Sequence, residues 1–240
     1  MNLFRMRRCR LLAGLIVLPL AASATPMALS LDADFQDQPV DQPIGLGGAA
    51  AGQPVSVSDL LSAVVRDTPM VSRSLELAWA APSSTASFVR FELPDGVEVT
   101  DGELLIEFEL LPQTATTHLV AIREAGTSAR NFGGLRLNSS GQMQVGDGAG
   151  FVLVPGGWSA GTTLRPWFLY DLDARVWSFG IGDQTVLVDR PLSPPADGRG
   201  IGSLSFGLDF NSPPESKLSI DSIQIGRPVV DAMFADGFEQ

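Results

Sequence analysis

Cysteine and histidine are nearly absent from this sequence. Its 240 residues include one cysteine, Cys9, and one histidine, His118. Cys9 lies in a segment that we expect to be removed, so the mature chain should form neither disulfides nor thiolate metal sites, and its stability must come from its core. With a single histidine left, a zinc site of the usual kind is excluded.

The chain also lacks an apolar run long enough to cross a membrane. The run near its start, Leu11 to Leu20, has about half of the roughly 20 residues that a spanning helix needs. It is preceded by Arg5, Arg7, Arg8 and Arg10 and followed by Ala21, Ala22, Ser23 and Ala24. This order is typical of a secretory signal peptide. We therefore expect a signal peptide over residues 1–24, with a membrane anchor as the alternative.

Cleavage between Ala24 and Thr25 would release a protein without a membrane span into the periplasm or the medium. A lipoprotein anchor is not expected, because Cys9 precedes this cleavage point instead of following it. Extracellular proteins of complex cells often carry disulfides, so a cysteine-free exported chain favours a bacterial origin.

Basic residues are scarce. The chain has 16 lysines and arginines against 27 acidic residues, a net charge of -11. Without the four arginines of the expected signal peptide, the net charge falls to about -15. The acidic residues are dispersed along the chain and do not form an acidic tail. Such a surface repels phosphates and anionic lipid, so nucleic acid is excluded as a partner.

No sustained helical period follows residue 70. Turn signals such as Asp95-Gly96, Asp101-Gly102 and Gly182-Asp183 separate short runs rich in Val, Ile, Phe, Leu and Thr. This pattern predicts an all-β fold, an antiparallel β-sandwich of two sheets, in one domain over residues 25–228 with a short tail over 229–240. A helix is expected only near residues 59–65, where Ser58 can cap it. The expected strands cover residues 87–93, 104–111, 117–123, 134–138, 142–145, 164–171, 175–181, 185–189, 203–208 and 218–225.

Alternation with a period of two assigns the faces of these strands. The residues expected to point into the core are Val89, Phe91 and Leu93, then Ile106, Phe108 and Leu110, and then Trp177, Phe179 and Ile181. Arg90, Glu92, Glu107 and Glu109 are expected on the opposite faces.

A set of short motifs between Leu31 and Gly226 carries a family resemblance. The motifs are Asp34-Phe35, Gly133 to Leu137 with the turn Asn138 to Gly141, Gly157-Trp158, Gly161-Thr162, Tyr170-Asp171 through Trp177 to Asp189, and Leu218 to Ile223. In this order they resemble the concanavalin A-like lectins and glucanases and the laminin G-like domains, which implies a jelly roll. That superfamily contains sugar-binding modules, glycosidases, lyases and structural domains, so the resemblance does not imply one function.

The last residues resemble a second pattern. Phe234 to Glu239 reads Phe-x-Asp-Gly-Phe-Glu, which is similar to a short tail found in exported proteins of some Gram-negative bacteria. A terminal turn is the alternative interpretation.

One stretch matches a catalytic motif by its letters only. Gly157 to Gly161 fits the G-x-S-x-G elbow of serine hydrolases, which needs a strand-to-helix turn and a later histidine. The single histidine, His118, comes earlier, and the surrounding sequence predicts strands. We expect a loop at this motif and a buried, hydrogen-bonded His118.

Three glutamates are expected on one face of a strand, at Glu103, Glu107 and Glu109. Residues two apart on a strand are about 7 Å apart, which suits the paired carboxylates of a glycosidase. The strand resembles in part the E-x-D-x-E strand of laminarinase-like enzymes. Leu105 interrupts the set, however, and Leu111 stands where a third acid would follow. Catalysis by Glu107 and Glu109 is therefore the alternative, and solvated glutamates are the main expectation.

Other residues are candidates for binding. Trp158, Trp167 and Tyr170 can stack on sugar rings, with Trp167 and Tyr170 on opposite faces of one strand, and core packing is the alternative for each. Arg90 and Arg136 would join them if they shared a groove with the glutamates. Aspartates cluster at Asp32, Asp34, Asp37 and Asp41, with Asp221 on the closing strand. Asp34 and Asp221 are the candidate ligands of a structural calcium ion, and no other cofactor is expected.

These observations favour an exported, non-catalytic binding or structural protein with carbohydrate as its ligand. Two alternatives stay open. One is a glycoside hydrolase or polysaccharide lyase on the same fold. The other is a cell-surface module that binds proteins through an exposed apolar patch.

Overall fold

Strands make up most of the computed structural model, which describes residues 27–126, 131–147, 149–193 and 199–228. The strands of the first sheet, sheet A, are β1 (Met27–Ala33), β3 (Leu61–Arg66), β4 (Ser74–Trp79), β6 (Glu103–Pro112), β11 (Pro166–Asp171), β12 (Val176–Ile181), β13 (Gln184–Pro191) and β15 (Lys217–Pro228). Those of the second, sheet B, are β2 (Ser56–Val57), β5 (Ser87–Glu92), β7 (His118–Arg123), β8 (Asn131–Leu137), β9 (Met143–Asp147), β10 (Gly150–Val154) and β14 (Ser203–Leu208). Two single-turn 3-10 helices, η1 (Ala49–Ala51) and η2 (Pro94–Gly96), lie in the connections.

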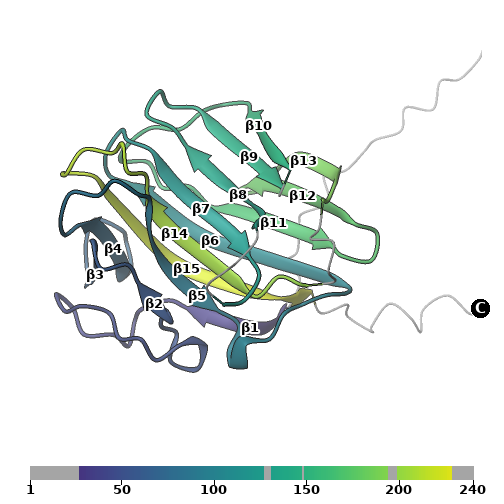
Figure 1. Ribbon diagram of the computed structural model, residues 1–240, viewed down its shortest axis with the longest axis horizontal. Coiled ribbons are helices and arrows are strands. Elements are labelled where there is room, and N and C mark those ends of the chain that lie inside the picture. The colour runs from purple at the N-terminus through teal and green to yellow at the C-terminus, as the bar shows by residue number, and fades with distance from the viewer. Residues whose placement is uncertain (1–26, 127–130, 148, 194–198, 229–240) are drawn as a thin grey trace, which may run out of the picture.

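The two sheets are antiparallel and pack face to face (Figure 1). Sheet A has the order β13-β12-β11-β6-β15-β4-β3, and β1 also pairs with β15. Sheet B has the order β10-β9-β8-β7-β14-β5-β2. The predicted β-sandwich of two antiparallel sheets is thus confirmed. Neighbours in each sheet are often far apart in sequence, which brings distant segments together on one face.

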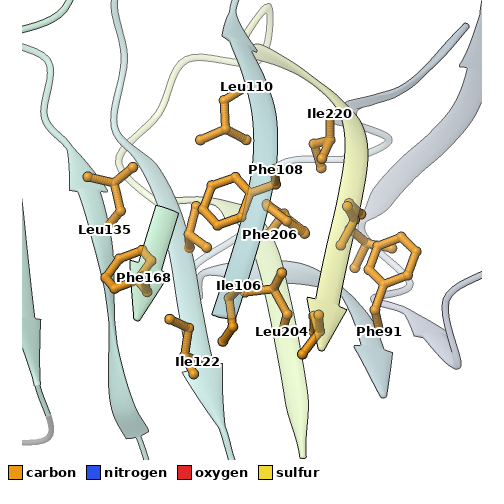
Figure 2. Close-up of a cluster of buried hydrophobic side chains, with 14 of the residues drawn as sticks. Phe91, Ile106, Phe108, Leu110, Ile122, Leu135, Phe168, Leu204, Phe206 and Ile220 are labelled. Atoms are coloured by element: carbon orange, nitrogen blue, oxygen red, sulfur yellow. The ribbon is translucent and has the colours of Figure 1, made fainter. Parts of the chain in front are cut away.

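The core lies between the sheets and follows the predicted alternation. Phe91 of β5 and Phe108 of β6 are buried, and both pack edge-on against Phe206 of β14 (Figure 2). Their ring centroids lie 6.1 and 5.2 Å from that of Phe206. Edge-to-face packing of this kind is favourable beyond the burial of apolar area. The inner faces of both sheets contribute to one continuous cluster.

The prediction of a helix at residues 59–65 is wrong, because most of this segment belongs to the strand β3. Leu61, Ala63 and Val65 are buried and the residues between them are not, which is the period of a strand. β3 pairs with β4 along its whole length, from Leu61 opposite Trp79 to Arg66 opposite Ser74. Pairing with β4 therefore decides the conformation of this segment, and the capping signal at Ser58 does not.

The structure also has strands that the sequence patterns missed, namely β1, β2, β4 and β10. The expected signal peptide and the tail over 229–240 lie outside the described residues. Among the helices of the described part, none is long and apolar enough to span a membrane.

Candidate functional site

A hollow of about 340 Å³ opens on the outer face of sheet A, the face turned away from the core. Its floor includes Glu107 and Glu109, which alternate on β6 with the buried Phe108. Its other lining residues are Arg165, Pro166, Trp167, Gly182, Asp183, Ser222 and Gln224. They come from the start of β11, the turn between β12 and β13, and the middle of β15. A hollow of this volume is at the small end of the range for ligand sites.

Strand register explains why these residues meet. Gln224 of β15 lies opposite Glu107 of β6, and Glu107 lies opposite Trp167 of β11. The row continues to Gly180 of β12 beyond Trp167 and to Asp32 of β1 beyond Gln224. Residues directly opposite in adjacent strands share a face of the sheet. The row therefore places an aromatic ring, a carboxylate and an amide side by side on one surface.

Trp167 is held in a fixed orientation. Its Nε1 donates a hydrogen bond to the carbonyl of Gly182 at 3.0 Å, and its ring lies against Gly180. A Cβ on residue 180 would be 2.2 Å from two carbons of the indole, so the ring occupies the space that any other side chain would need. Trp167 is only half-buried. The indole is thus a partly exposed platform at the wall of the hollow.

The two glutamates of the hollow differ in their partners. Glu109 forms an ion pair with Arg165, whose Nε lies 2.7 Å from Glu109 Oε1. Glu107 makes no hydrogen bond or ion pair with the described residues, and its partial burial raises its pKa. Arg165 therefore stabilises the negative charge of Glu109, while the carboxylate of Glu107 is free to contact a ligand.

A β-bulge in β15 shapes the side of the hollow next to Gln224. Asp221 lies opposite Glu109 and Gln224 opposite Glu107, so three steps along β15 match two along β6. Ser222, within the bulge, has a φ of 51°, a left-handed conformation that is uncommon for a residue other than glycine. Bulges redirect side chains and are frequent beside binding sites.

Asp221 and Asp34 were the candidate calcium ligands. Asp221 is 1% exposed, and it accepts hydrogen bonds from the Ser72 hydroxyl and from the backbone N–H of Ser222 at 2.7 Å. Burial raises its pKa, and the charges of Glu109 and Asp34 raise it further. No group of three or more metal-ligating side chains is assembled within the ranges that the structure describes. A calcium site at these two residues stays a prediction.

Arg90 and Arg136 lie on sheet B and do not approach the glutamates. Arg90 donates from Nη1 to the carbonyl of Gly126 at 2.6 Å and pairs with Glu92, Nε to Oε1, at 3.3 Å. Arg136 lies 3.7 Å from a carboxylate oxygen of Asp209. The two arginines and the two glutamates are therefore on opposite outer faces of the sandwich, and no common groove joins them.

The other two candidate aromatic residues are in the core. Tyr170 is fully buried, as expected for the face opposite to Trp167. Trp158 is 8% exposed, and its Nε1 donates to the carbonyl of Asn138 at 3.0 Å. Neither ring offers a free face to a ligand, so of the three aromatic candidates only Trp167 enters the site described above. Glu103, at the exposed start of β6, does not line the hollow.

The expectation of a buried, hydrogen-bonded His118 is confirmed. It is 1% exposed, its Nε2 lies 2.9 Å from the carbonyl oxygen of Thr114, and its ring packs edge-on against Trp158. Burial lowers its pKa. Ser159 lies in an exposed loop that precedes β11 and not at a strand-to-helix turn. His118 thus has a structural environment, and the G-x-S-x-G match has no elbow around it.

Sequence reasoning missed several residues of the site, among them Arg165, Asp183, Ser222 and Gln224, which line the hollow, and Gly180, which lies against Trp167. The first of these precedes a predicted strand and has no motif around it. Gly180 carries a weak signal, because an isolated glycine within a strand marks the close approach of another group. The bulge at Ser222 leaves no trace in the pattern of apolar residues.

An exposed apolar stretch lies on β10, an edge strand of sheet B. Phe151, Val152 and Leu153 are all exposed, at 54, 38 and 59%. Such a stretch is the feature that a protein-binding module requires. The protein-interaction alternative stays a prediction.

Comparisons with solved structures support the fold. The chain is similar to a sialidase, with a TM-score of 0.54 and 13% identity over 84% of this chain, although it spans only 19% of that protein. It is also similar to a carbohydrate esterase from the Shiga toxin-encoding bacteriophage phi24B, with a TM-score of 0.52 and 11% identity over 83% of this chain and 98% of the esterase. No family model matches the chain, and no curated protein matches its sequence. At these identities the likeness shows a shared β-sandwich fold.

Proposed function

We propose that this protein is an exported, non-catalytic carbohydrate-binding protein of the concanavalin A-like type, and that its glycan binds in the hollow on sheet A. The observation that carries the proposal is the fixed, partly exposed indole of Trp167 at the wall of a polar hollow. Similarity to a sialidase and to a carbohydrate esterase supports a carbohydrate ligand at the level of the fold.

The hollow offers the two kinds of contact that a sugar needs. The faces of a pyranose ring present C–H groups that pack on an aromatic ring, and its edges present hydroxyls that hydrogen-bond to polar side chains. Trp167 supplies the aromatic face, and Glu107 and Gln224 in the same row supply acceptors and a donor. Because Gly180 and Gly182 already fix the indole, little rotamer freedom is lost on binding.

Binding without catalysis fits the acidic residues of β6. A glycosidase needs two carboxyl groups in separate roles across one bond. Glu109 is already paired with Arg165, and the positions before and after the glutamate pair on this face are Leu105 and Leu111. The strand therefore lacks the longer series of acids that its resemblance to laminarinase-like enzymes would require.

Glycan-array screening followed by titration calorimetry tests the proposal. We expect retention of one or more glycans and at least about a tenfold loss of affinity in Trp167→Ala, equivalent to about 1.4 kcal/mol. Leu169→Ala is the matched control, because Leu169 lies on the same face of β11 but outside the hollow. Retention of no glycan, or equal losses in both variants, would refute the proposal.

A glycoside hydrolase or lyase that uses Glu107 and Glu109 is the second candidate. One observation favours it: the pKa of Glu107 is raised while Glu109 is held by a cation, and such a difference is how one carboxyl acts as acid and the other as base or nucleophile. Incubation with β-glucans and with uronate polymers tests it. Release of reducing ends that is abolished in Glu107→Gln would replace the non-catalytic proposal, and absence of release would eliminate this candidate.

Export is proposed from the sequence alone. The basic, apolar and small-residue order over residues 1–24 supports it. N-terminal sequencing of the protein recovered from the periplasm or medium of a Gram-negative host should begin at Thr25. A protein that keeps Met1 and stays with the cytoplasmic fraction would overturn this part of the proposal.

A further inference from the structure

We infer that the hollow on sheet A selects an amino sugar, a glycan with protonated amines, over neutral glycans, and that it discriminates against glycans with carboxylates. This inference rests on the proposed function. It adds the chemical class of the ligand, and it names Glu107 as the residue that determines the preference.

The first argument is the charge of the surface around the hollow. Three acidic residues line it, Glu107, Glu109 and Asp183, against one basic residue, Arg165. Two further carboxylates adjoin this set by strand register: Asp221 lies opposite Glu109, and Asp32 lies opposite Gln224. A ligand with a negative charge would be repelled by this field, and a positive charge would be attracted.

The second argument is that the one lining cation is already engaged. The 2.7 Å ion pair between Arg165 Nε and Glu109 Oε1 offsets the positive charge of the guanidinium. An acidic sugar that approached the remaining N–H groups of Arg165 would also approach the carboxylate of Glu109, which repels it. The pair therefore offers an anionic ligand little net attraction.

The third argument is the position of Glu107. Its carboxylate has no partner among the described residues, and Glu107 lies opposite Trp167 in the register of β6 and β11, so that both residues line the hollow. A sugar ring on the indole therefore has its edge substituents beside Glu107. An ammonium group there forms a charge-assisted hydrogen bond with the carboxylate, which is about twice as strong as the bond to a neutral hydroxyl.

Three oligosaccharides of equal length separate the ligand classes: a glucosamine oligomer, an N-acetylglucosamine oligomer and a galacturonate oligomer. Titration with the full-length mature protein at low salt and a pH of about 6, where sugar amines are protonated, gives the affinities. We expect the glucosamine oligomer to bind about tenfold more tightly than the N-acetylated one and the galacturonate oligomer to bind most weakly.

The variant Glu107→Gln assigns the preference to one residue. It should lose most of the tenfold preference for the glucosamine oligomer over the N-acetylglucosamine oligomer, because the amide keeps the shape of the side chain and loses its charge. Glu103→Gln is the control, because it removes one negative charge from the exposed start of the same strand, away from the hollow. It should keep the tenfold preference.

The possible failures are distinguishable. If the variant and the wild-type protein discriminate equally between the amine and its acetylated form, or if the galacturonate oligomer binds best, the inference is wrong and the carbohydrate site remains. If none of the three oligomers and no glycan on an array binds, the proposed function falls together with the inference.

Discussion

The indole of Trp167 lies directly over Gly180, its partner on the neighbouring strand. The two residues are opposite one another in the register of β11 and β12, and a Cβ at position 180 would meet the indole at 2.2 Å. Because Gly180 has no side chain, the indole of Trp167 can pack against its backbone. This relationship makes Gly180 a positioning residue for the proposed site.

Gly180→Ala should therefore weaken glycan binding and also lower the free energy of unfolding. The new Cβ would contact the indole and also lie 2.4 Å from the backbone oxygen of Gln184, so both the ring and the hairpin must shift. Overpacking of this kind costs about 1 to 3 kcal/mol, measured by denaturant unfolding. Gly150→Ala is the control, since a Cβ there meets nothing within 4 Å. Unchanged tryptophan fluorescence and stability in Gly180→Ala would contradict this account.

Much of the fold could be predicted from local sequence patterns. The prediction failed at β3, where the local signals disagree with one another. Alternation assigned Phe91 and Phe108 to the core because a half-buried strand repeats every two residues. The segment with Leu61, Ala63 and Val65 also alternates, but it was short and followed a helix-capping serine, so the local signals conflicted. Only pairing with β4, which no local signal encodes, settles the conformation as a strand.

The site was less predictable than the fold because it depends on which strands become neighbours. The sequence indicated that Glu107, Glu109 and Arg90 all point outward, and they do. It did not indicate that Arg90 belongs to the opposite sheet, or that Arg165 would complete the pair with Glu109. These are contacts between residues far apart in the chain, fixed by the order of strands in each sheet.

Glu98 should make stability depend on pH in the acidic range. Its carboxylate accepts hydrogen bonds from Arg199 and from the backbone N–H groups of Gly200 and Ala125. Arg199 is the main cause that lowers its pKa from 4.5 to about 2. Because the pKa is lower in the folded than in the unfolded chain, this stabilisation is complete above pH 4.5 and disappears as the pH falls towards 2.

Glu98→Gln should accordingly be less stable than the wild-type protein at neutral pH, by about 2 kcal/mol. The difference should shrink as the pH falls below 4.5 and vanish below the folded pKa of about 2, as followed by thermal unfolding across the acidic range. Asp101→Asn is the control, because its pair with Arg227 is exposed on both sides and such pairs contribute less than about 1 kcal/mol. Equal effects of the two substitutions would show that the contacts of Glu98 contribute no more to stability than an exposed ion pair does.

Phe206 of β14 contacts aromatic rings from both sheets. It is fully buried between Phe91 of its own sheet and Phe108 of the other. Phe206→Ala should lower the free energy of unfolding by about 3 to 5 kcal/mol, because it removes apolar contacts and leaves a cavity. Phe151→Ala, on the exposed edge strand β10, should change stability by less than about 0.5 kcal/mol. A loss below about 1 kcal/mol for Phe206→Ala would contradict this packing.

Glu107 should lower the stability of the free protein at neutral pH. Burial raises its pKa above 4.5 in the folded state, so folding disfavours the charged form, and the protein loses stability as the pH rises through the raised pKa. Glu107→Gln should be more stable than the wild-type protein at pH 7, and the two should be equally stable well below pH 4.5. Because the side chain is only half-buried, solvent screening keeps the gain below about 1 kcal/mol.

The neighbouring glutamate provides the contrast. Glu109→Gln removes the partner of Arg165 and should not stabilise the protein at any pH. Thermal unfolding of both variants, each at neutral and at acidic pH, makes the comparison. A binding group is expected to lower the free energy of unfolding of the free protein and to stabilise the protein when its ligand is bound. If Glu107→Gln were no more stable than Glu109→Gln at pH 7, the carboxylate of Glu107 would have a structural partner after all, and its availability to an amine would be refuted.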